Sequence, residues 1–111
     1  MAITIKEYQE FTPKTFIVPH KLISTQDVYL FTGLVAEAGE LAGNFAKHCR
    51  GDFDIYELIT RTKKELGDVL YFSFQLANHL NLDIEEILEQ NKVKLEDRLA
   101  RGKIKGDGEV R

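Results

Sequence analysis

The 111-residue sequence has one cysteine, Cys49, two prolines and no tryptophan. A single cysteine excludes an internal disulfide. No apolar run approaches the roughly 18 residues that a membrane-spanning helix needs. The first stretch, MAITIKEYQEF, lacks the apolar core of a secretory signal. These absences lead us to expect a cytoplasmic protein in a reducing compartment, without a membrane partner.

An excess of positive charge is also missing. The chain carries 15 Lys and Arg against 18 Asp and Glu, a formal charge of −3. This balance disfavours a broad nucleic-acid surface, so we expect no nucleic-acid polymer as a partner. A domain of this length would bury only about two thirds of its unfolded surface by itself. Partner chains are therefore expected to complete the core.

Apolar residues recur at helical spacing along most of the chain, and no segment alternates apolar and polar residues as a β-strand would. A short helix is predicted from Thr4 to about residue 11, before Pro13 and Pro19 make residues 12–23 irregular. A long helix should then start at Ser24 or Thr25 and end at Gly51.

Two further helices follow in the pattern. Asp54 is a suitable N-cap for a helix that runs to a break at 81–83. Asp83, with Glu86 three residues on, resembles the capping box of a third long helix. Residues 102–111 are rich in Gly and charge and are expected to form a flexible tail. The fold class is thus an all-α single domain over 1–111, an antiparallel helical bundle completed by oligomerisation.

Two stretches, GLVAEAGEL and KKELGDVLYF, place acids beside an apolar helical stripe. Glu37 and Glu40 are three residues apart, as are Glu65 and Asp68, so each pair shares one helix face. If the helices pack antiparallel through their stripes, the pairs face each other and repel unless a cation lies between them. Such oxygen ligands suit Mg²⁺, with Mn²⁺ as a substitute. One E-x-x-E pair alone is usually solvated, and it is the matched second pair that favours metal binding.

The third long helix carries the opposite charge. Asn91, Lys94 and Arg98 share one face, with Arg101 near its edge, and this stripe suits phosphate. Taken alone, such cations are more often a solvated helix face. Lys47 lies on the same edge of its helix as Glu40. Acids for metal and cations for phosphate, on adjoining helices, suggest metal-assisted attack on a polyphosphate.

Around these residues the sequence resembles the MazG-like, all-α nucleoside triphosphate pyrophosphohydrolases. GLVAEAGEL and ELGDVLYF are similar to the family's GLagEaGE and ELGDvLwy. IKEYQ resembles its N-terminal segment, and NKVKLEDRLARGKIKGDGEVR resembles its N-x-x-KL-x-x-R helix and basic tail. Many relatives carry another Glu before the first acid, where this chain has Ala36.

The resemblance implies cleavage of a nucleoside triphosphate into the monophosphate and pyrophosphate. It also implies a role in removing unwanted nucleotides from the nucleotide pool, and assembly as a homodimer or homotetramer. It implies that Mg²⁺ is held by Glu37, Glu40, Glu65 and Asp68. Glu37 or Glu40 would act as the general base. The residues expected to bind the triphosphate are Lys47, Asn91, Lys94 and Arg98.

Several alternatives stay open at this point. The preferred base is not specified, although Tyr8, Phe16, His20 or Tyr71 could stack on one. A phosphoribosyl-ATP pyrophosphohydrolase has a related fold, and a non-catalytic helical nucleotide-binding or assembly module would share the pattern. Residues 69–77 are apolar on nearly every side, and Phe74 is expected at a subunit interface.

Overall fold

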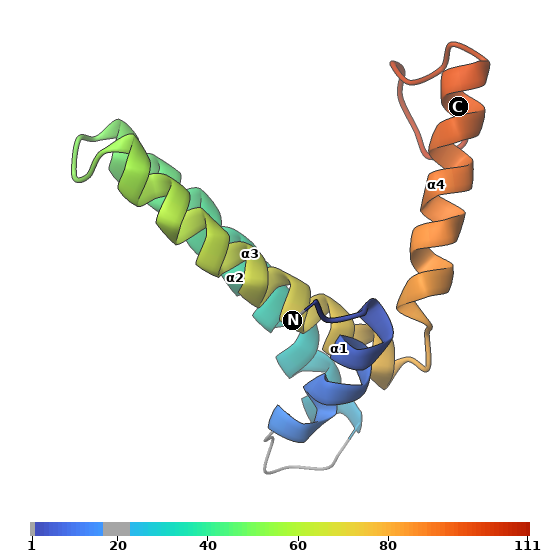
Figure 1. Ribbon diagram of the computed structural model, residues 1–111, viewed down its shortest axis with the longest axis horizontal. Helices are drawn as coiled ribbons and strands as arrows, with labels where there is room; N and C mark the ends of the chain where they lie inside the picture. The colour runs from blue at the N-terminus through green and yellow to red at the C-terminus, as the bar shows by residue number, and fades with distance from the viewer. Residues whose placement is uncertain (1, 17–22) are drawn as a thin grey trace.

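The computed structural model describes residues 2–16 and 23–111, and it contains only helices in those ranges. The α-helices are α1 (Ile5–Phe11), α2 (Ile23–Cys49), α3 (Ile55–His79) and α4 (Ile84–Ala100), with a 3₁₀ turn, η1, at Thr12–Thr15. The predicted all-α fold class is confirmed. In Figure 1, α2 and α3 form a long antiparallel hairpin, and α4 leaves its open end as the second arm of a V, with α1 at the vertex. None of the helices in the described part of the chain is long and apolar enough to cross a bilayer.

The helix starts follow local capping chemistry. Thr4 Oγ1 and Asp54 Oδ1 each accept a hydrogen bond from the backbone N–H three residues on, at 3.0 and 2.9 Å. Asp83 also caps as predicted, but its carboxylate accepts from the N–H of Glu85, not of Glu86. Helix α2 already begins at Ile23, so the two residues that were predicted to cap it lie inside the helix.

Helices α2 and α3 pack closely at Gly33 of α2, which has no side chain. A Cβ built on Gly33 would lie 2.2 Å from Cε1 of Phe72, so only glycine lets the Phe72 ring rest on the α2 backbone. The same ring packs against Tyr29, with centroids 5.7 Å apart. One turn from Gly33, Leu30 is 1% exposed. This contact fixes the axial register of the two helices, and with it the level at which their acids meet.

Helix α1 covers the core of the open end. The ring of Tyr8 meets that of Phe74 edge-on, with centroids 4.8 Å apart, and Phe74 also packs with Ala77 and Ile84. The expectation that Phe74 lies at a subunit interface is therefore wrong: this side chain is buried within its own chain. Periodicity could assign residues 5–11 to a helix but could not say which side of α3 that helix would cover.

Gln9 joins three helices at the vertex. Its Nε2 donates to Asn78 Oδ1 and to the Leu82 carbonyl, at 3.0 and 2.9 Å, and its Oε1 accepts from the Ile84 N–H at 3.2 Å. Asn78 in turn donates to the Gln9 carbonyl. These bonds hold the turn between α3 and α4, and so the direction in which α4 departs.

Candidate metal centre

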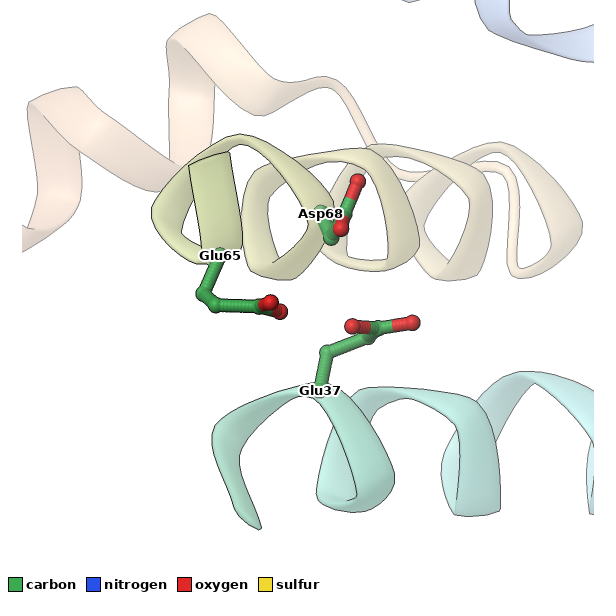
Figure 2. A group of neighbouring side chains, drawn as sticks. All are labelled: Glu37, Glu65 and Asp68. Atoms are coloured by element: carbon green, nitrogen blue, oxygen red, sulfur yellow. The ribbon is translucent and has the colours of Figure 1, made fainter. Parts of the chain in front are cut away.

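The facing sides of α2 and α3 bring three carboxylates together midway along the hairpin. Glu37 reaches from α2 toward Glu65 and Asp68 on α3, as Figure 2 shows. One carboxylate oxygen from each residue lies within 4.8 Å of the others. Because i and i+3 share a helix face, α3 presents both of its acids to the same point. Three of the four acids named in the sequence, Glu37, Glu65 and Asp68, thus meet across the antiparallel hairpin, and Glu40 is not among these three.

Two oxygens of this cluster lack any hydrogen-bond partner. Oε2 of Glu37 and Oε2 of Glu65 are buried, and neither accepts a hydrogen bond from the described residues. Buried carboxylate oxygens are costly unless a donor or a cation compensates for their lost hydration. The donor set is oxygen only, which is the preference of hard divalent cations. The residues present thus fit a Mg²⁺ or Mn²⁺ ion.

Mutual repulsion also marks the cluster. Burial, and then the nearby charges of Glu40 and Asp68, raise the pKa of the Glu37 carboxyl from 4.5 to about 7. Burial, then a hydrogen bond with Glu40 and the charge of Glu40, likewise raise the pKa of Glu65. Glu40 itself is exposed, so it lies at the solvent edge of the cluster, next to both residues.

Comparison with known proteins agrees with this geometry. Residues 27–101 match the MazG nucleotide pyrophosphohydrolase domain, which is well over half of the chain. The chain belongs to the MazG family. A curated relative, the Gene 37 protein of Mycobacterium phage L5, is 38% identical over 85 residues, covering 75% of each chain. No solved structure matches the chain significantly.

The MazG match runs from within α2 to the start of the turn after α4, so it contains both acidic pairs. Helix α1 and all of residues 102–111 lie outside it. Position 36, before the first acid, is Ala36, which offers no ligand atom. The assignment of Glu37, Glu40, Glu65 and Asp68 as metal ligands stays a prediction.

The predicted phosphate-binding residues are not gathered at the acids within one chain. Asn91, Lys94 and Arg98 lie on α4, which packs against α1 and points away from the hairpin (Figure 1). Arg98 is only 5% exposed and Lys94 pairs with Glu109 at 2.6 Å. Lys47 is exposed on the last turns of α2. Their role in substrate binding stays a prediction.

One cation near the acids was missed by the sequence analysis. Arg61 lies one turn before Glu65 on α3, and its Nη1 donates to Asn44 Oδ1 at 3.4 Å across the groove. Asn44, one turn after Glu40, is buried, and the Arg61 guanidinium stacks 4.1 Å above the Phe53 ring. Arg61 is four residues before Glu65, and Asn44 is four residues after Glu40, so each shares a helix face with an acid. This spacing is the sequence signal that could have identified the pair.

At the opposite end of the cluster lie aromatic residues that were proposed to stack on a base. Burial, and then the charges of Tyr71 and Asp68, raise the pKa of the Tyr8 hydroxyl, which places Tyr8 near both. The Tyr71 hydroxyl is hydrogen-bonded to Thr15 at 2.8 Å. Phe16 instead packs on the Tyr29 ring, with centroids 5.9 Å apart. His20 lies outside the described residues.

Charge repulsion in the cluster leads to a prediction about the metal-free protein. Because the pKa of Glu37 is about 7 in the folded chain and 4.5 ordinarily, the folded state holds a proton that the unfolded state has lost between those pH values. The free energy of unfolding should therefore fall as pH rises from 4.5 to about 7. Glu37→Gln should flatten this slope and raise Tm in EDTA at pH 8, on the order of 5 °C.

The measurement is thermal unfolding by circular dichroism from pH 4 to 8, at one protein concentration. Glu89→Gln is the matched control, since Glu89 is an exposed acid on α4, outside the cluster, and should leave the pH profile unchanged. A Glu37→Gln protein that melts below wild type at pH 8 would contradict the clustered geometry.

Proposed function

We propose that this MazG domain hydrolyses nucleoside triphosphates to the monophosphate and pyrophosphate, using Mg²⁺, with Mn²⁺ as a substitute. The observation that carries the proposal is the carboxylate cluster, with two buried oxygens lacking a partner, inside a region that matches the MazG domain. Glu37, Glu65 and Asp68 would hold the ion. When bound, it would supply charge neutralisation at the phosphates and make a water molecule more acidic.

Glu40 is our choice for the general base. Glu40 and Asp68 are both exposed, but only Asp68 belongs to the three carboxylates whose oxygens lie within 4.8 Å of one another. Glu40 stands outside that group and lies next to both Glu37 and Glu65. A carboxylate at the solvent edge can orient a water molecule toward the α-phosphorus and accept its proton. Glu37 and Glu65 are half-buried, each with a buried Oε2, and are better suited to ligation, because a cation would relieve the unfavourable burial of their charge.

The triphosphate needs cations that a single chain does not place at the acids. Arg61 and Lys47 belong to the hairpin, and we assign them to the end of the groove beyond Glu40. The stripe of Asn91, Lys94 and Arg98 would have to come from the α4 of another copy. We therefore propose a homodimer, or a dimer of dimers, in which α4 of one chain completes the site of its partner.

The shape of the chain supports this assembly. Its accessible surface is 8536 Å², whereas a compact protein of 12.7 kDa exposes about 6,200 Å². Its radius of gyration is 17.2 Å, against about 13 Å for a compact chain of this length. The excess surface, about 2,300 Å², is of the size that permanent interfaces bury.

The exposed apolar side chains lie on the elements that such an interface would join. Those on α2 and α4 include Val28, Phe31, Val35, Leu88, Leu95 and Leu99, each at least 49% exposed except Leu95 at 43%. A symmetric pairing that covers these faces would also carry α4 toward the partner's hairpin. We propose a second copy of this chain as the occupant for that reason.

The reaction can be tested by hydrolysing a panel of nucleoside triphosphates in ¹⁸O-labelled water with Mg²⁺. Attack at the α-phosphorus should place the label in the monophosphate, and EDTA should abolish pyrophosphate release. Label in pyrophosphate, or release of orthophosphate alone, would mean a different reaction. A non-catalytic module would release nothing, and selective turnover of phosphoribosyl-ATP would favour that narrower activity.

A further inference from the structure

Residues 102–111 form a strap along the end of α4, visible in red in Figure 1. Arg101 Nη2 donates to the Arg111 carbonyl at 2.7 Å, which ties the two ends of the strap together. The Arg111 guanidinium donates at 2.7 to 3.2 Å to three carbonyls within the strap, those of Lys103, Ile104 and Gly108. The expected tail thus folds back on its helix, while its flexibility stays a prediction.

Two glycines let the strap reverse direction. Gly106 and Gly108 have φ angles of +140° and +87°, a region that disfavours residues with a Cβ. A Cβ on Gly106 would also meet Arg111 Cδ at 2.9 Å. The reversal returns residue 109 to the flank of α4, alongside the cationic stripe.

Glu109 thereby contacts the cations that we assign to the triphosphate. Its carboxylate accepts a hydrogen bond from Lys94 Nζ at 2.6 Å and lies 3.7 Å from Arg98 Nη2. Arg98 also donates to the Glu109 carbonyl. The hydrogen bond from Lys94 and its charge lower the pKa of the Glu109 carboxyl, so it is ionised at neutral pH.

The two partners of this contact differ in their exposure to solvent. The Arg98 side chain is 6% exposed, whereas that of Glu109 is 73% exposed. An ion pair with a solvated carboxylate is weak, because water screens it. A triphosphate offers more negative charge and oxygens that a guanidinium can bind in a bidentate manner. A triphosphate should therefore displace the Glu109 carboxylate from Lys94 and Arg98.

We propose that residues 102–111 are an autoinhibitory strap, in which Glu109 occupies the phosphate-binding cations Lys94 and Arg98 and is displaced by the substrate's phosphates. This inference rests on the proposed function, which assigns those cations to the triphosphate. Its test uses binding and not turnover, so failure of the enzymatic reaction and failure of the strap are separate results.

The test is calorimetric titration of inorganic tripolyphosphate into the full chain. Glu109→Gln should lower Kd about fivefold, because it removes the competing charge while keeping the shape of the side chain. Asp107→Asn is the matched control, because it removes one charge from the same strap. Among the described residues the Asp107 carboxylate accepts a hydrogen bond only from the Gly108 N–H and forms no ion pair, so Kd should stay within about twofold. An unchanged or weaker affinity of Glu109→Gln would overturn the proposal.

A second measurement needs no variant. In wild-type protein, tripolyphosphate should speed amide hydrogen exchange across residues 103–111, since displacement of Glu109 opens the strap. Slower or unchanged exchange there would show that the strap helps to bind the anion or ignores it, and either outcome rejects autoinhibition.

Discussion

Asp68→Asn is expected to lower kcat/KM for a nucleoside triphosphate by about 10³ or more. The carboxylate of Asp68 is one of three whose oxygens lie within 4.8 Å of each other. An amide keeps the size of the side chain but removes the charge that would attract a divalent cation. Metal-ion stabilisation of the transition state is worth several kcal/mol, and each 1.4 kcal/mol is a factor of ten in rate.

Steady-state kinetics with Mg²⁺ would measure this loss, and binding of Mn²⁺ followed by electron paramagnetic resonance should weaken in parallel. Glu89→Gln, an exposed change outside the cluster, should retain wild-type activity. Thermal unfolding in EDTA should show that Asp68→Asn is folded and no less stable than wild type, since one repulsive charge has gone. Activity within tenfold of wild type would remove Asp68 from the metal centre.

Mixing two inactive variants should restore activity if α4 acts on the partner's site. Asp68→Asn lacks a working acid cluster, and Lys94→Ala should lose about 10² in kcat/KM because it removes a charged hydrogen bond to phosphate. In a mixed dimer one site combines the intact acids of one chain with the intact α4 of the other. Random exchange of subunits should then recover about one quarter of wild-type activity.

The measurement is activity after co-refolding the two variants at equal concentration. Light scattering of wild type should give a mass of at least twice the 12.7 kDa of the chain. Each variant alone, taken through the same refolding, is the control. If both residues served the same chain's site, mixing would give no recovery. A wild-type protein that is folded, active and monomeric at micromolar concentration would defeat the assembly altogether.

Much of this protein could be predicted from local sequence. The starts of α3 and α4 could be predicted from their capping residues, Asp54 and Asp83, and the helices themselves from the spacing of apolar residues. Capping and helix formation depend on neighbours within about one turn of the chain. The paired acids could be predicted for the same reason, since i and i+3 share a face whatever the helix packs against.

Other features depended on contacts between residues far apart in the chain. Phe74 has the pattern of an interface residue, yet Tyr8, 66 positions earlier, covers it. Burial, then the charge of Glu40 on the same helix and that of Asp68 on α3, raise the pKa of Glu37 to about 7, and the contribution of Asp68 exists only across the hairpin. The partnership of Arg61 with Asn44 likewise exists only across the hairpin.

The sequence alone determined an all-α chain with two acidic pairs, each on one face of its helix, because backbone hydrogen bonding and side-chain period are local properties. Only the tertiary structure decided where α4 points and what covers its cations. The direction of α4 depends on Gln9, which bonds to residues more than 65 positions away, and Arg98 is buried by a strap that reverses at Gly106 and Gly108. Periodicity says which face of a helix is apolar or charged, but the surface that meets that face is chosen by distant side chains of complementary shape and charge.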